Sequence, residues 1–122
     1  MTTSSAVTWN LEAFKKFNAA VNTLTVNSRS SSPAEREKVI NFLARCSHDP
    51  DIIKIILDAL RRFGDNFSEA EKIRIAEILN PQGHISPLTM QSLRDSVEKI
   101  IIRERSPQVG SALMRMLEKI TE

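Results

Sequence analysis

Helix-start signals recur along almost the whole chain. Ser-Pro or Asp-Pro pairs stand at Ser32-Pro33, Asp49-Pro50, Ser86-Pro87 and Ser106-Pro107. Ser and Asp side chains cap the free N–H groups of a first helical turn, and Pro fits that turn because its missing N–H would be unpaired there. Ser68 and Glu71 add the spacing of a capping box. These signals predict helices that begin near residues 33, 50, 69, 87 and 107.

Between these signals, apolar residues recur at intervals of three and four, which gathers them on one face of a helix. In the segment 10–26 this stripe consists of Leu11, Phe14, Phe17, Val21 and Leu24. The segment from Pro50 to Gly64 is apolar around most of its circumference, so we expect it at the centre of the core. We therefore predict an all-α fold with five or six helices between residues 9 and 121.

The length of 122 residues fits one domain. We predict a disordered tail over residues 1–8 and a single helical domain over 9–122, with a flexible Ser-rich loop at 27–32. The helix starts recur about every 17–20 residues, so pairs of helices recur in the range of known two-helix repeats. We find no residue signature shared between such pairs. A compact bundle is the preferred architecture, and a short HEAT-like helical-repeat stack is the alternative.

Side chains suited to chemistry near neutral pH are scarce, because the chain has two His, one Cys and no Tyr. The single Cys excludes an internal disulfide and a multi-cysteine zinc site. Cys46 falls on an apolar stripe, where a buried and inert thiol is usual. His48 and His84 fall in turns between helices. We predict that the protein is not an enzyme and that it holds no cofactor and no metal.

The surface is therefore where we expect function to lie. Trp9 precedes the first helix and has no evident core position. It either caps the end of the bundle, which is the preferred interpretation, or anchors a partner, since Trp is enriched among such residues. Basic residues gather in two stretches of sequence, but acidic residues are interleaved, so a salt-bridged, solvated surface explains them better than a nucleic-acid site does. The candidate partner-binding residues are Trp9, Arg61, Arg62, Lys72, Arg74, Arg103 and Arg105.

The predicted function is a non-catalytic helical protein–protein interaction module: an adaptor, a regulatory subunit or a small viral or host-targeting factor. The alternative is a nucleic-acid-binding accessory protein that uses the basic surface, although the net charge is only +2. The expected partner is another protein, and a homodimer through the Ile-rich helix that begins at Pro87 is a further option. No apolar run is long enough to span a bilayer and no secretory signal is present, so we expect an intracellular protein, cytoplasmic or nuclear, with no membrane partner.

Overall fold

The computed structural model describes residues 11–46, 48–81 and 85–121, and over these ranges the chain forms six α-helices and no strand. The all-α prediction is thus confirmed. Two short 3-10 turns, η1 (Ser28–Ser30) and η2 (Gly64–Asn66), follow the first and third helices. The helices are α1 (Leu11–Leu24), α2 (Pro33–Cys46), α3 (Pro50–Arg62), α4 (Glu69–Ile78), α5 (Pro87–Arg103) and α6 (Pro107–Thr121).

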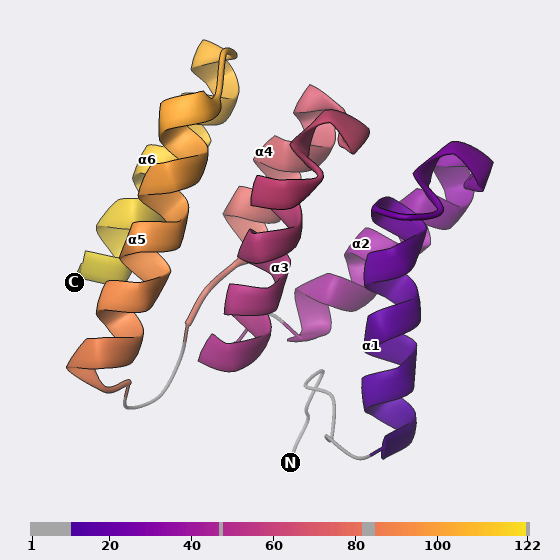
Figure 1. The fold of residues 1–122 in the computed structure, drawn as a ribbon, viewed down its shortest axis with the longest axis horizontal. Helices are drawn as coiled ribbons and strands as arrows, with labels where there is room; N and C mark the ends of the chain where they lie inside the picture. Colours follow the sequence, from indigo (N-terminus) through magenta and orange to yellow (C-terminus); the bar gives the residue numbers. More distant parts are fainter. Residues whose placement is uncertain (1–10, 47, 82–84, 122) are drawn as a thin grey trace.

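The helices alternate in direction and form three consecutive pairs that lie side by side (Figure 1). Within the first and last pairs, α1 packs on α2 and α5 on α6. Between pairs, α3 packs on α5, and α4 packs on both α2 and α6. The result is a compact bundle in which α4 occupies a central position, with a neighbouring helix on either side. This arrangement places the starts of α2 and α4 at the same end of the molecule, and that end carries the candidate site (Figure 1).

The predicted helix starts are confirmed, and side-chain caps account for several of them. The carboxylate of Asp49 accepts a hydrogen bond from the Asp51 N–H at 2.9 Å before α3. The Ser86 hydroxyl accepts one from the Thr89 N–H at 3.2 Å at the start of α5. Each cap pairs one of the N–H groups that a first helical turn leaves without a partner, so local sequence fixes where these helices begin.

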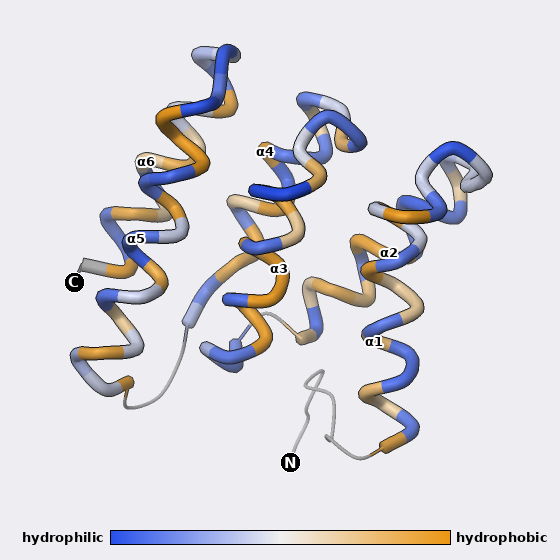
Figure 2. The backbone as a smooth tube through the Cα atoms, viewed as in Figure 1, coloured by the Kyte–Doolittle hydropathy of each residue, from blue (hydrophilic) through white to orange (hydrophobic). Residues whose placement is uncertain are grey.

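The core lies between the pairs and is built from the predicted apolar stripes, which recur along every helix (Figure 2). The segment expected at its centre is largely buried, but Ile55 of α3 remains 37% exposed. Two assignments on the first stripe were wrong, since Leu11 is 73% exposed and Phe14 is 43% exposed. The reason is the position of α1 at the edge of the bundle, where it packs mainly on α2. A single main neighbour leaves part of the apolar face of α1 uncovered.

Several predicted features fall outside the described residues, namely the tail over 1–8, Trp9 and His84. The Ser-rich segment 27–32 is described, and η1 lies within it. There the Ser31 hydroxyl donates to the backbone oxygens of Thr23, at 3.0 Å, and Asn27, at 2.8 Å. In the part of the chain that the structure describes, no helix has both the length and the apolar character needed to cross a membrane.

Candidate functional site

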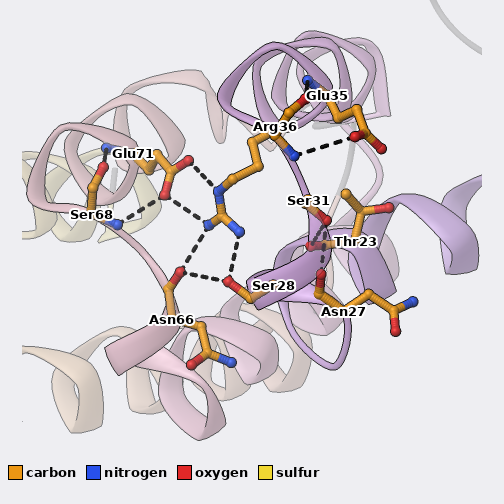
Figure 3. Close-up of polar contacts among 10 residues, drawn as sticks. Thr23, Asn27, Ser28, Ser31, Glu35, Arg36, Asn66, Ser68 and Glu71 are labelled. Atoms are coloured by element: carbon orange, nitrogen blue, oxygen red, sulfur yellow. Dashed lines mark hydrogen bonds and ion pairs between the residues drawn. The ribbon is translucent and has the colours of Figure 1, made fainter.

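Arg36 joins the first helical pair to the second and is only 9% exposed. Its Nε and Nη2 atoms donate to the two carboxylate oxygens of Glu71 at 2.7 and 2.8 Å, which forms a bidentate ion pair between α2 and α4. Nη1 donates to the Ser28 hydroxyl at 2.7 Å, and Nη2 also donates to the Asn66 carbonyl at 2.8 Å (Figure 3). Bidentate, charge-assisted bonds of this kind are among the strongest polar contacts in proteins. We call Arg36, Glu71, Ser28 and Asn66 the Arg36 clasp.

The clasp is held in place by further bonds on both sides. The Asn66 side-chain amide donates to the Thr25 carbonyl at 2.9 Å, which ties η2 to the end of α1. Glu71 is oriented by the capping box of α4, in which the Ser68 N–H donates to its carboxylate at 2.8 Å (Figure 3). The hydrogen bond from Arg36 holds the pKa of Glu71 below its ordinary value, against the opposing effect of burial. The same bond raises the pKa of Arg36, so the pair is fully charged at neutral pH.

A second cation links α4 to the last helical pair. Lys72 Nζ donates to Glu104 at 3.0 Å, just beyond the end of α5. The other carboxylate oxygen of Glu104 accepts from the Ser106 N–H at 3.1 Å. Burial alone would raise the pKa of Glu104, but the bonds from Lys72 and Ser106 outweigh it and leave the pKa below its ordinary value. The Ser106 hydroxyl also donates to Glu69 at 2.6 Å, so two polar bonds connect α4 with the turn before α6.

Arg36 and Lys72 occupy the same position in a short repeated sequence that sequence analysis missed. Residues 32–36 and 68–72 share one pattern, in which Ser is followed by any residue, then Ala, Glu and a cation. The two segments stand at the starts of α2 and α4, one pair of helices apart. In both copies the Ser and Glu form a reciprocal capping box, and the cation is the fourth residue of its helix. Each cation pairs with an acid of the next helical pair. In α6 the fourth residue is Gly110, so this helix has no cation at the equivalent position.

Beside the Arg36 clasp, a groove of about 640 Å³ lies between the first turns of α2 and α4. Its apolar surface comes from Pro33, Ile40 and Ala70. Glu37 of α2 and Arg74 of α4 add charged groups, and Ser68 together with the clasp residues completes the lining. We refer to it as the α2–α4 groove.

The structure divides the predicted basic residues among separate places. Arg74 lines the α2–α4 groove and donates to the Asn41 side chain, while Lys72 is engaged by Glu104. Arg61, Arg62 and Arg103 converge on a second hollow, of about 230 Å³, between the ends of α3 and α5. Arg105 is exposed and lines neither of these cavities. Trp9 cannot be placed, because it precedes the described residues.

Cys46 is buried, as predicted, with 3% of its surface exposed. Burial raises the pKa of its thiol to about 11 from an ordinary 9.0, against a smaller opposing effect of Arg45. A shift of this size lowers the thiolate fraction at neutral pH about a hundredfold. We therefore expect a maleimide to label the native protein at least about a hundredfold more slowly than the urea-unfolded chain. Equal labelling rates, followed by mass spectrometry, would contradict the buried and inert assignment.

Comparison with known proteins returns no match among protein-family models, curated proteins or solved structures. The function of the site is therefore inferred from its own geometry.

His48 lies in the turn before α3, with its Nδ1 atom 3.2 Å from the Asn80 carbonyl oxygen. Among the residues that the structure describes, no three His, Cys, Asp or Glu side chains gather into a group able to hold a metal ion. The α2–α4 groove, at about 640 Å³, is larger than the hollow between the ends of α3 and α5, at about 230 Å³.

Proposed function

We propose that this chain is a non-catalytic interaction module that holds a short extended segment of a partner protein in the α2–α4 groove. The observation that carries this proposal is the groove itself, whose volume of about 640 Å³ falls in the range of sites that bury ligands. Its lining combines apolar surface with a few charged groups, as binding sites commonly do. Apolar surface of Pro33, Ile40 and Ala70 offers a place for one apolar side chain of the partner.

Two charged residues on the walls favour a peptide as the occupant. Glu37 makes no hydrogen bond or ion pair with another side chain in the described part of the protein. Arg74 donates to Asn41, and its remaining donors have no partner among the described residues. The groove thus presents an unused acceptor on α2 and unused donors on α4. A peptide main chain carries both N–H and C=O groups and satisfies both walls, whereas an anion or an apolar ligand satisfies at most one.

The Arg36 clasp supports this role by fixing the groove before a partner arrives. Arg36 and Glu71 lie on the two helices that form the walls, and their bidentate bond sets the distance between the first turns of those helices. A preformed groove costs less conformational entropy on binding than one that must be assembled, so more of the contact energy remains as affinity. The clasp is therefore a positioning element, and the unused groups of Glu37 and Arg74 are the contacting ones.

A peptide selection with two matched variants tests the proposal. Peptides that bind the full chain are selected from a random library, and their affinities are measured by calorimetry. Ala70→Trp places an indole in the groove, whereas Ser111→Trp places one on the exposed side of α6. We expect Ala70→Trp to weaken binding at least about tenfold, because the indole occupies the space that the peptide needs, and Ser111→Trp to change it less than about twofold.

Two outcomes would contradict this function. Selected peptides that bind both tryptophan variants equally well would place the interaction elsewhere on the protein. In light scattering of the free chain, a dimer that dissociates on Ala70→Trp would identify a second copy of the chain as the occupant. Thermal unfolding followed by circular dichroism verifies that both variants are folded, which is expected because both positions are exposed.

A further inference from the structure

We infer that the hollow between the ends of α3 and α5 is a binding site for the phosphate groups of a phosphate ester. Its volume is about 230 Å³, and three arginines line it: Arg61 and Arg62 from the last turn of α3, and Arg103 from the last residue of α5. These residues are far apart in the sequence, and the packing of α3 on α5 brings them together. We call this cavity the arginine hollow. It is separate from the α2–α4 groove and does not depend on the function proposed for that groove.

The arginine hollow has an excess of positive charge that the surrounding residues do not neutralise. Two acids also line it, Asp65 and Glu104. The carboxylate of Glu104 is already engaged by Lys72 at 3.0 Å, so that pair contributes no net charge. Asp65 then faces three guanidinium groups, which leaves an excess of two positive charges. Within the described ranges, none of the three arginines forms an ion pair. An anion entering the hollow would therefore meet donors that are not already committed to a carboxylate.

Contacts within the protein partly offset the mutual repulsion of the three arginines. Each lies in the last turn of a helix, where a cation interacts favourably with the partial negative charge of the terminal carbonyl groups. The Arg62 guanidinium in addition lies over the Phe63 ring, 5.9 Å from its centroid. These contacts orient the guanidinium groups but leave N–H donors available. Arginine binds phosphate well because its planar guanidinium group can donate two parallel N–H bonds to two oxygens of the phosphate.

Phosphate groups of this kind come from two sources, a small phosphate ester or the backbone of a nucleic acid. Two further basic residues close to Arg61 and Arg62 in the sequence already have partners, since Lys72 pairs with Glu104 and Arg74 donates to Asn41. The basic surface that the arginine hollow offers is thus compact, with three arginines and not the six basic candidate positions suggested by the sequence. Two separate probes, inorganic pyrophosphate and a ten-nucleotide oligothymidylate, distinguish the sources.

The test compares two double variants that remove the same net charge. Arg62→Gln with Arg103→Gln alters the hollow, and Lys38→Gln with Arg115→Gln alters exposed residues that do not line it. Binding of each probe to the full chain is measured by calorimetry at low salt. We expect the hollow variant to weaken binding of at least one probe about tenfold or more, since charge-assisted bonds are lost, and the control to change it less than about twofold.

The pattern of results identifies the source or overturns the proposal. A loss confined to pyrophosphate assigns the hollow to small phosphate esters, and a loss confined to the oligonucleotide assigns it to a nucleic-acid backbone. The proposal would be overturned if the unaltered chain bound neither pyrophosphate nor the oligonucleotide. Equal weakening by the two double variants would overturn it too, because it would show diffuse charge attraction. Circular dichroism verifies folding, and the single substitutions replace the double one if it impairs the fold.

Discussion

Replacing Leu57 by alanine is expected to lower the free energy of unfolding by about 3 kcal/mol, within the range of about 2–5 kcal/mol typical of such a substitution in a packed core. Leu57 lies on α3 and is fully buried. The loss has two parts, the transfer free energy of the deleted methyl and methylene groups and the cost of the cavity that they leave. Because α3 packs against α5 and faces the interior, little rearrangement is available to fill that cavity.

Leu88→Ala is the matched control, since it deletes the same atoms from a leucine that is 84% exposed. We expect it to change the free energy of unfolding by no more than about 0.5 kcal/mol. Both values are obtained from urea unfolding followed by circular dichroism. A cost below about 1 kcal/mol at Leu57, or equal costs at the two positions, would contradict the packing described for α3.

Replacing Arg36 by methionine is expected to lower the free energy of unfolding by about 2–3 kcal/mol. Methionine keeps most of the apolar stem but removes every hydrogen bond that Arg36 donates in the clasp, so Glu71 is left partly buried without its cation. Leaving one partner of such a pair unpaired costs more than the intact pair gains. The side chain of Glu71 retains 19% exposure, so water compensates in part, and the cost stays below that of a fully buried pair.

Lys72→Met provides the comparison, because it removes the equivalent cation between the second and third helical pairs. Lys72 makes a single bond to Glu104, and that carboxylate, although its side chain is only 9% exposed, keeps its hydrogen bond from the Ser106 N–H, so we expect a smaller loss of about 1 kcal/mol. Urea unfolding measures both variants. If Arg36→Met cost no more than Lys72→Met, the bidentate clasp would not be the main polar connection between the first two helical pairs.

The pH dependence of the free energy of unfolding tests the same clasp independently. The folded-state pKa of Glu71 lies below its ordinary value, so the unfolded chain binds the proton more readily. The stability contributed by Glu71 is therefore present above the ordinary carboxyl pKa and is lost as the pH falls through the lowered, folded value. In the Arg36→Met variant the pKa of Glu71 returns toward the ordinary value. The difference in free energy of unfolding between the two proteins should then shrink as the pH is lowered.

The helices and the core could largely be predicted from the sequence, because capping and periodicity act over a few residues. Ser68 and Glu71, for example, form a capping box that involves only their own turn. The exposure of Leu11 and Phe14 could not be predicted, since it depends on which helices lie beside α1. Periodicity identifies an apolar face but does not tell whether a neighbour covers it.

The candidate site was less predictable, because it depends on contacts between residues far apart in the sequence. Lys72 and Arg74 were grouped as one basic cluster, yet residues two apart on a helix point in nearly opposite directions. Since α4 lies between α2 and α6, one of these side chains meets Glu104 and the other meets Asn41. Arg36 was not singled out at all. The available signal was the repeat of Ser, Ala, Glu and a cation at 32–36 and 68–72.

Amide chemical-shift mapping tests the central claim, that the α2–α4 groove takes an extended segment of a partner protein. The measurement uses the ¹⁵N-labelled full chain and a peptide selected for binding to it. The account predicts that the largest shift changes cluster at Glu37, Ala70 and Arg74 and at their neighbours on α2 and α4, with small changes on α5 and α6. Largest changes on α5 and α6, or changes spread evenly over the surface, would contradict it.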